Sequence, residues 1–363
     1  MLPLYRTSEA GRRVLAGRPL AGNAGLWFDK FAGPWRWDEG RSTLEFDKKE
    51  WLRSFCVSKA GVGSELLEFA WRQAELVQAM KGEWAVFRAE SRFVTGLGRA
   101  HPVENGLAWH YTLGTPYLPG SSVKGLTLAW ARLVGTERKD EIFGAPGASG
   151  MVAFLDAVPI EPVCLEVDVI TPHYAGWSAS DPPGDWRSPV PIHFLTVGRG
   201  SFWFFGVVPV PGRGEAQSAK VAFELLEAAL AERGAGARTA VGFGLFARDR
   251  ERTEKLSQHI AETRRREQEE ARRRELGKTR EGAWLLELER KSEDEVHDLV
   301  RRYIEKEQLE SAEERCAFAK AVLALPMAQS WRKGEKFDSR SRTGGTKAKE
   351  RFRLLKKLAD SQE

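Results

Sequence analysis

We predict an α+β fold from the order in which two kinds of apolar periodicity follow each other along the chain. Runs typical of strands lie at 84–95, 151–158, 165–170 and 191–208. Apolar residues at helical spacing follow a Pro-Gly turn at 119–120 and recur at 216–232. The resulting order of strand, helix, strand, strand, helix and strand is typical of the ferredoxin-like (RRM-like) sandwich, here with insertions. After residue 247 the pattern predicts helices only.

Composition divides the chain into four segments. We expect an N-terminal segment packing on the core (1–83), the ferredoxin-like domain with an inserted loop at 171–190 (84–247), a charged helical linker (248–282), and a helical, basic C-terminal extension (283–363). In the first segment, the aromatic patch at 23–31 is predicted to be irregular. The stretch 64–80 predicts a helix with Leu66, Ala70, Ala74 and Val77 on one face.

Two strand predictions concern how the sheet is built. In 84–95, apolar residues from Ala85 to Phe93 alternate with Arg88, Glu90 and Arg92, which predicts a strand with one exposed face. The longer run at 191–208 contains Gly198-Arg199-Gly200, and we expect a hairpin that turns there. The intervening stretch 171–190 is rich in Pro, Gly and aromatic residues, and long loops of this kind inside compact domains tend to be functional.

The helix after the Pro-Gly turn carries a candidate anion site at its start. Ser121 or Ser122 is expected to cap the helix, leaving free N–H groups at the positive end of its dipole. Lys124 lies in the first turn, where a cation opposes the dipole and is not needed for helix stability. Gly125 follows it. An ordinary capped helix with a solvent-facing lysine explains the same pattern.

A second candidate site is a glycine-rich loop between the helix at 216–232 and an apolar strand through Phe246. Its four glycines are Gly234, Gly236, Gly242 and Gly244, with Arg238 and Thr239 between them. Glycines let main-chain N–H groups converge on an anion, while the arginine fork and the hydroxyl suit phosphate oxygens. A helix C-cap followed by an edge strand is the simpler interpretation. Because the loop follows a helix, it differs from Rossmann and P-loop motifs.

Charge and cysteine content limit the classes of function. The 363 residues carry a net charge of +5, but 332–357 alone contains eleven basic and three acidic residues. Such a basic arm is either a nucleic-acid contact or a solvated tail. The three cysteines are far apart and predict neither a metal site nor a disulfide framework. With no signal peptide or membrane-length apolar run, we expect a cytoplasmic protein.

Several motifs together resemble one family. The Pro-Gly-Ser-Ser-Val-Lys-Gly helix start and the Gly-Ala-Gly-Ala-Arg-Thr-Ala-Val-Gly-Phe-Gly loop look like the RAMP superfamily of CRISPR RNA-binding proteins. The segments 23–31, 154–157 and 171–174 resemble the family of the sixth Cmr subunit of type III-B effector complexes. Arg238 stands where these proteins usually carry lysine. No defining motif of the family is evident after residue 250.

The resemblance implies a role in antiviral defence. Members of this family bind the crRNA (guide RNA) near its 3′ end, beside the repeated backbone subunit and a neighbouring 3′-end capping subunit, in complexes that also engage target RNA. They are not regarded as the nuclease, and no cofactor or metal is implied. The implied RNA contacts are Ser121, Ser122, Lys124, Gly125, His173, Gly234, Gly236, Arg238, Thr239, Gly242 and Gly244.

Two alternatives remain open from the sequence. Other RAMP proteins are metal-independent nucleases that process guide-RNA precursors, and such cleavage needs a general base and acid, usually including a histidine. His110 and His173 are the two histidines to test, while Asp156 and Asp168 are expected to be structural. A purely architectural protein, which meets RNA only through its partners, is the other alternative. We expect no catalytic activity.

Overall fold

The computed structural model describes residues 22–32, 35–38, 40, 43–172, 188–305, 308–309, 311–333 and 344–360. The chain forms two compact units, which divide between Ile260 and Ala261. Helix α8 (Arg250–Leu276) begins in the first unit and continues into the second. Each unit has its own hydrophobic core.

The main sheet of the first unit is antiparallel. Its strands lie in the order β11-β3-β10-β6, with β7 also paired to β10. Their bounds are β3 (Glu83–Ala89), β6 (Val152–Phe154), β7 (Val158–Pro159), β10 (Phe202–Pro209) and β11 (Phe246–Arg248). The central pair aligns Trp203 with Phe87 and Phe205 with Ala85. Because β11 pairs only with β3 in the described part of the chain, the glycine-rich loop leads into an edge strand.

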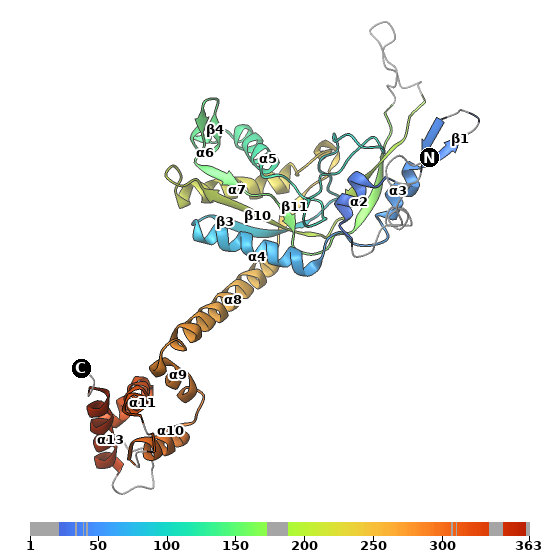
Figure 1. The fold of residues 1–363 in the computed structure, drawn as a ribbon. Helices are drawn as coiled ribbons and strands as arrows, with labels where there is room; N and C mark the ends of the chain where they lie inside the picture. Colours follow the sequence, from blue (N-terminus) through green and yellow to red (C-terminus); the bar gives the residue numbers. More distant parts are fainter. Residues whose placement is uncertain are drawn as a thin grey trace. The chain divides into compact units, whose positions relative to one another are not determined.

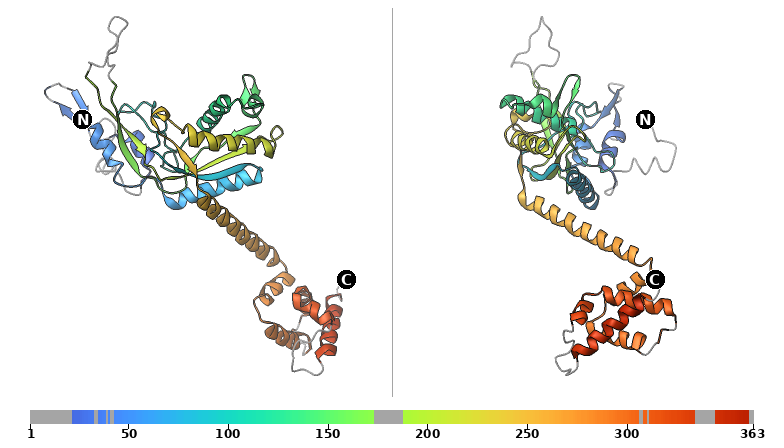
Figure 2. Two further views of the ribbon diagram at one scale, coloured as in Figure 1. Left: turned by 180° about the vertical axis from the view of Figure 1, so that it is seen from behind. Right: turned by 90° about the vertical axis from the view of Figure 1, so that its left-hand side faces the viewer.

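Helices cover both faces of this sheet (Figures 1 and 2). Helices α5 (Gly120–Leu133) and α7 (Ala216–Glu232) lie on one face, where Phe87 and Phe205 are buried. Helix α4 (Gly63–Ala79) lies on the other face and packs with Trp84 and Phe204. The four residues expected on the buried face of α4 are indeed buried, so this helix is confirmed.

The helix on the second face of the sheet contradicts the expectation that the strand at 84–95 has one exposed face. Trp84 and Val86 are buried under α4, so β3 is not exposed on one side, and it ends at Ala89 rather than at residue 95. The first turns of α8 add Leu256 and Ile260 to the same cluster. In RNA-recognition-type domains an open sheet face stacks on bases. That face is not available here.

The predicted hairpin at 191–208 is also wrong. Strand β9 (Ile192–Val197) pairs with β8 (Leu165–Ile170) in a separate two-stranded sheet, whereas β10 pairs with β3, β6 and β7. The turn at 198–200 therefore carries the chain from one sheet to another. Most of the inserted loop, including His173, lies outside the described residues.

The remaining elements of the first unit are short. They are α2 (Ala24–Lys30), β1 (Trp35–Asp38), β2 (Thr43–Phe46), α3 (Lys48–Ser54), α6 (Lys139–Phe143), β4 (Gly144–Ala145), β5 (Ala148–Ser149) and a 3₁₀ turn (Thr239–Val241). The aromatic patch expected to be irregular is helix α2, which is capped by the Asn23 side chain and buries Trp27 and Phe28. The Asn23 side-chain oxygen accepts a hydrogen bond from the Leu26 N–H, which has no partner within the helix. This cap stabilises so short a helix.

The second unit consists of helices around one apolar core. They are α9 (Arg280–Leu288), α10 (Glu293–Val300), a π-helical turn (Arg301–Glu305), α11 (Ala312–Ala324), α12 (Pro326–Lys333) and α13 (Gly344–Ala359). Phe318, Val322, Trp331 and Leu355 are buried at the centre. Side-chain caps from Thr279, Ser292 and Ser311 begin three of these helices.

Candidate nucleic-acid interface

The N-terminus of α5 differs from its sequence-based prediction. The helix begins at Gly120, so Ser121 and Ser122 lie inside its first turn and neither caps it. The Gly120 N–H instead donates to Asp156 Oδ1 at 2.6 Å. A Cβ at Gly120 would lie 2.2 Å from the Phe154 carbonyl oxygen, so only glycine fits this close approach. Because Asp156 satisfies the first amide, a phosphate cannot use that N–H, but both serines are exposed.

Lys124 and Ser122 point to different sides of α5. Residues two apart on a helix are separated by about 200°. Lys124 lines a hollow of about 530 Å³ together with Leu128 and Arg213, whereas Ser122 lines a separate cleft that faces the glycine-rich loop. Gly125 is exposed with open space where a Cβ would stand.

Three of the four loop glycines are required by the loop's own conformation. Gly234, Gly236 and Gly244 all have positive φ, and a Cβ on any of them would lie within 2.5 Å of a main-chain carbonyl oxygen. The closest approach is at Gly244, 1.9 Å from the Ala235 oxygen. Gly242 also has positive φ but is surrounded by open space. The loop is therefore a tightly folded main-chain structure.

Some of the loop amides are used within the protein and others are not. The Gly244 N–H donates to the Arg92 carbonyl at 2.7 Å, and Gly234 donates back to Ala229 at the end of α7. Neither amide is available to a ligand. By contrast, the N–H groups of Gly236, Arg238 and Thr239 have no acceptor among the residues that the structure describes. These three amides form the part of the loop able to bind an anion.

Arg238 is packed against aromatic rings. Its guanidinium carbon lies 5.4 Å from the ring centroids of both Phe194 and Phe243, within the range of a cation–π contact. Its Nε is buried and has no hydrogen-bond partner in the described part of the chain. Arg238 also adopts φ 62°, an uncommon conformation for a non-glycine residue. The rings hold this cation next to the 3₁₀ turn that begins at Thr239.

A cleft of about 430 Å³ brings the two sequence motifs together. One wall comes from α5, through Ser122, Leu126 and Ala129, and another from the loop between Arg233 and Thr239. Residues 95–98 form the third wall. None of the described lining residues is acidic. The cleft thus combines hydroxyl groups and main-chain amides with an apolar wall.

The structure sorts the predicted contacts into three groups. Ser122, Gly234, Gly236 and Thr239 line the cleft. The remaining described candidates, which do not line it, are Ser121, Lys124, Gly125, Arg238, Gly242 and Gly244. His173 lies outside the described residues. Sequence reasoning missed the wall at 95–98, although its Gly96-Leu97-Gly98 spacing was a usable signal.

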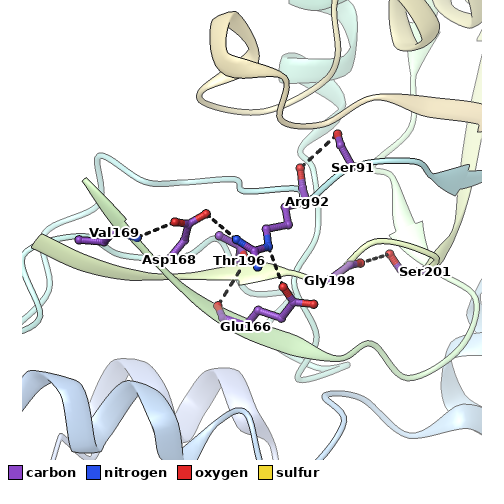
Figure 3. Close-up of polar contacts among 8 residues, drawn as sticks. All are labelled: Ser91, Arg92, Glu166, Asp168, Val169, Thr196, Gly198 and Ser201. Atoms are coloured by element: carbon purple, nitrogen blue, oxygen red, sulfur yellow. Dashed lines mark hydrogen bonds and ion pairs between the residues drawn. The ribbon is translucent and has the colours of Figure 1, made fainter. Parts of the chain in front are cut away.

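A charged network ties Arg92, which follows β3, to two carboxylates of β8 (Figure 3). The Arg92 side chain donates to Glu166 Oε2 at 2.7 Å and to Asp168 Oδ2 at 3.0 Å. The hydrogen bond to Glu166 is the main cause that raises the pKa of Arg92 above its ordinary value. Arg92 and its neighbour Ser91 also accept main-chain hydrogen bonds from Gly244 and Leu245. Asp168 thus has a structural partner, and Arg92 is a residue that sequence reasoning did not single out.

His110 occupies a packed position. Its ring makes edge contacts with Phe69 and Tyr117, at centroid distances of 5.3 and 5.6 Å. The Leu113 N–H lies 3.3 Å from its Nδ1. Burial lowers the pKa of His110, and the Asp156 carboxylate opposes this shift. In the described chain, no group of three or more His, Cys, Asp and Glu side chains is arranged to hold a metal ion, and no helix is long and apolar enough to cross a membrane.

Comparison with known proteins identifies the class of this domain. Residues 86–247 match the RAMP superfamily. The match covers β3 to β11, and therefore includes every wall of the cleft. The family resemblance noted in the sequence motifs is confirmed.

Two similar proteins carry names that are narrower than the superfamily. The CRISPR system Cmr subunit Cmr6 of Pyrococcus furiosus is 30% identical, in a match covering 44% of this chain and 65% of the relative. The CMR subunit Cmr6 of Saccharolobus solfataricus is 28% identical over 39% of this chain and 48% of the relative. The matches thus span less than two thirds of either relative. A chain in the cryo-EM structure of the type III-B Cmr-beta complex bound to cognate target RNA is 24% identical, with a TM-score of 0.47, covering 56% of this chain and 71% of that chain.

Proposed function

We propose that this protein is a non-catalytic, guide-RNA-binding subunit of a type III-B CRISPR effector complex. In this proposal it binds crRNA near the 3′ end and closes that end of the backbone, next to the repeated backbone subunit and a second capping subunit. Both curated relatives carry the name Cmr6, which supports membership of such a complex. The observation that carries RNA binding is the cleft that unites Ser122 with the glycine-rich loop.

The chemistry of the cleft suits a ribose-phosphate chain. The N–H groups of Gly236 and Thr239 have no acceptor in the described chain and can donate to phosphate oxygens from a fixed main-chain position. The hydroxyls of Ser122 and Thr239 are further donors. Arg233 supplies one positive charge. Such contacts position a backbone without reading its sequence. Because α4 covers the outer face of the sheet, the RNA would run along this cleft and not over the strands.

We infer that the core has the ferredoxin-like topology. Numbering the four principal strands along the chain, β3, β6, β10 and β11, gives the spatial order 4-1-3-2, and α5 and α7 are the two connecting helices. The strand-helix-strand-strand-helix-strand order is that of the split βαβ motif. The β8–β9 sheet is then an insertion before the third core strand, and the helices beyond β11 are a C-terminal extension.

A matched pair of variants tests the RNA site. Ser122→Asp places a carboxylate in the cleft, whereas Ser121→Asp places one in the same helical turn, away from its wall. An acidic residue in a first turn is tolerated by the helix dipole, so both variants should keep their stability within about 1 kcal/mol. We expect Ser122→Asp to weaken crRNA binding about ten-fold and Ser121→Asp less than about three-fold, since like charges repel. Fluorescence anisotropy of the isolated chain measures both.

The results also separate the alternatives. Equal effects of the two substitutions would remove the cleft from the proposal, and no crRNA binding by the unmodified chain would favour a purely architectural role. To test the 3′-end assignment, crosslinked peptides from the assembled complex should map to the 3′ part of the guide. Peptides attached only to its 5′ part would contradict it.

The absence of catalysis is a separate part of the proposal. The aromatic packing of His110 and the hydrogen bond at its Nδ1 support a structural role. We expect precursor and target RNA to remain uncut by the purified chain in the presence of a chelator. Cleavage that is lost on His110→Ala or His173→Ala substitution would establish the nuclease alternative.

A further inference from the structure

We propose that the exposed side of helix α13 in the second unit is a second RNA-binding surface, which holds single-stranded RNA through its phosphates without reading the sequence. This surface comprises Lys347, Lys349, Arg353, Lys356 and Lys357. It lies outside the region that matches the RAMP superfamily, and it belongs to the second unit whereas the cleft belongs to the first.

The helix presents these cations in an ordered way. Its opposite side packs on the core of the unit through Ala348, Leu355 and Ala359, of which Leu355 is fully buried. The packing fixes the helix, so the five basic side chains project together from its exposed side. A helix of 16 residues is about 24 Å long, which allows contacts with several successive phosphates.

The five charges of this surface on α13 are available to a ligand. None of the five side chains has an ion pair or hydrogen bond with any residue that the structure describes. In the same unit, other cations do pair with carboxylates, among them Arg272, Arg273, Arg274, Lys278 and Arg280. Glu350 is the one acidic residue within α13. An excess of unpaired cations creates a field that attracts a polyanion.

The chemistry favours RNA over a protein partner. The centre of a protein–protein interface is rich in apolar and aromatic residues and poor in lysine. The exposed side of α13 has the opposite composition, with Leu354, 39% exposed, as its one large hydrophobic side chain among the described residues. Interfaces with nucleic acids are far more positively charged. Four of the five cations are lysines, which act as point charges and lack the planar fork of arginine for reading bases.

A groove extends this surface. It has a volume of about 560 Å³ and is lined by Arg301, Glu305, Lys347, Glu350, Arg351 and Leu354. Arg351 is held there by Glu305, which neutralises it. Arg301 and Lys347 line the groove without an ion-pair partner in the described chain, and Lys347 joins the groove to the rest of the basic surface.

The test uses the full-length chain and an unstructured oligouridylate. In one variant the five α13 cations are changed to glutamine, which is a good helix former. In the control variant the five paired cations, Arg272, Arg273, Arg274, Lys278 and Arg280, are changed to glutamine. Both variants lose the same net charge from the same unit, so a general electrostatic effect would be equal in the two.

We expect the α13 variant to lose affinity about ten-fold or more at low salt, and the control less than about three-fold. If all five cations contact phosphates, the slope of log K against log salt should fall in magnitude by about 3.5 for single-stranded RNA. Circular dichroism checks that each variant keeps its helix content. A third variant, with Lys347, Lys349, Lys356 and Lys357 changed to arginine, should keep the slope and affinity of the unmodified chain.

Three outcomes would overturn the proposal. They are an unchanged salt slope in the α13 variant, an equal loss in the control variant, and loss of affinity on lysine-to-arginine exchange. Unchanged RNA affinity with reduced assembly into the effector complex would likewise reject RNA as the occupant in favour of a protein partner. When the α13 changes are combined with Ser122→Asp, the fold-losses of RNA affinity should multiply, because independent sites contribute additively to the binding free energy.

Discussion

The cleft of the first unit and the basic helix of the second, which we propose as two RNA-binding sites, offer an anion different kinds of contact. The cleft offers main-chain amides and hydroxyls on a folded loop, with Arg233 as its one charged lining residue in the described chain. Helix α13 offers five cations that are unpaired among the described residues, on a regular helix. The first depends on an unusual backbone conformation, the second on side-chain charge and on packing that keeps the helix in place. Substitutions that disturb the backbone conformation of the loop should therefore affect the first unit, and substitutions that disturb the packing of α13 should affect the second.

The largest effect is expected at Gly244. A Cβ there would lie 1.9 Å from the Ala235 oxygen at φ +75°, so Gly244→Ala should destabilise the first unit by more than about 3 kcal/mol. Gly125→Ala is the matched control, since that helical position has open space and alanine should stabilise it by about 0.5–1 kcal/mol. Denaturant unfolding measures both. A small loss at Gly244 would show that the loop is less tightly folded than its geometry indicates.

Packing dominates in the second unit. Leu355 is fully buried beneath the basic surface of α13. Leu355→Ala should lower the free energy of unfolding of this unit by about 2–4 kcal/mol through lost apolar contact and the cavity left behind. Leu354→Ala, on the exposed side of the same helix, should cost less than about 1 kcal/mol. Hydrogen exchange resolved by segment checks whether the loss is confined to residues 261–363.

The second unit should also lose stability in acid because of His297. Burial, and then the adjacent Arg351 cation, lower the pKa of His297 to about 4. The unfolded state, with a pKa near 6.5, therefore binds more protons than the folded state between pH 6.5 and 4. Stability should fall as the pH falls through this window, by an amount on the order of 3 kcal/mol. Comparing the pH dependence of unfolding with that of His297→Gln isolates this contribution, and identical profiles would contradict it.

The smallest effect is expected at Arg92. Its side chain is 46% exposed, so loss of its pairs with Glu166 and Asp168 should cost only about 1 kcal/mol. Arg92→Lys keeps the charge but loses the fork, and it should recover part of this energy. Thermal unfolding at low and high salt measures both variants. A loss of several kcal/mol would mean that the network also holds the glycine-rich loop in place.

Local patterns predicted the helices well. The apolar face of α4 and the bounds of α7 follow directly from residues spaced three and four apart. The aromatic patch that forms α2 was missed, because its seven residues are too few to show a period. Its helix depends on the Asn23 cap and on burial of Trp27 and Phe28.

Contacts between distant residues decided what the local patterns could not. Gly198-Arg199-Gly200 signals a turn, but the signal is the same whether the next strand pairs with β9 or joins another sheet. The start of α5 was misplaced because its first amide is satisfied by Asp156, 36 residues away, and not by a nearby serine. The opposite directions of Ser122 and Lys124 likewise appear only once the helix is placed against the loop.

The sequence by itself determined the α+β class, the two motifs and the excess of basic residues near the C-terminal end, since these depend on residue type and short-range spacing. Only the tertiary structure decided that Ser122 meets the glycine-rich loop in one cleft, that α4 closes the outer face of the sheet, and that five of the cations of α13 are unpaired among the described residues. The physical reason is that burial and ion pairing depend on neighbours brought together by folding, and spacing along the chain does not specify them.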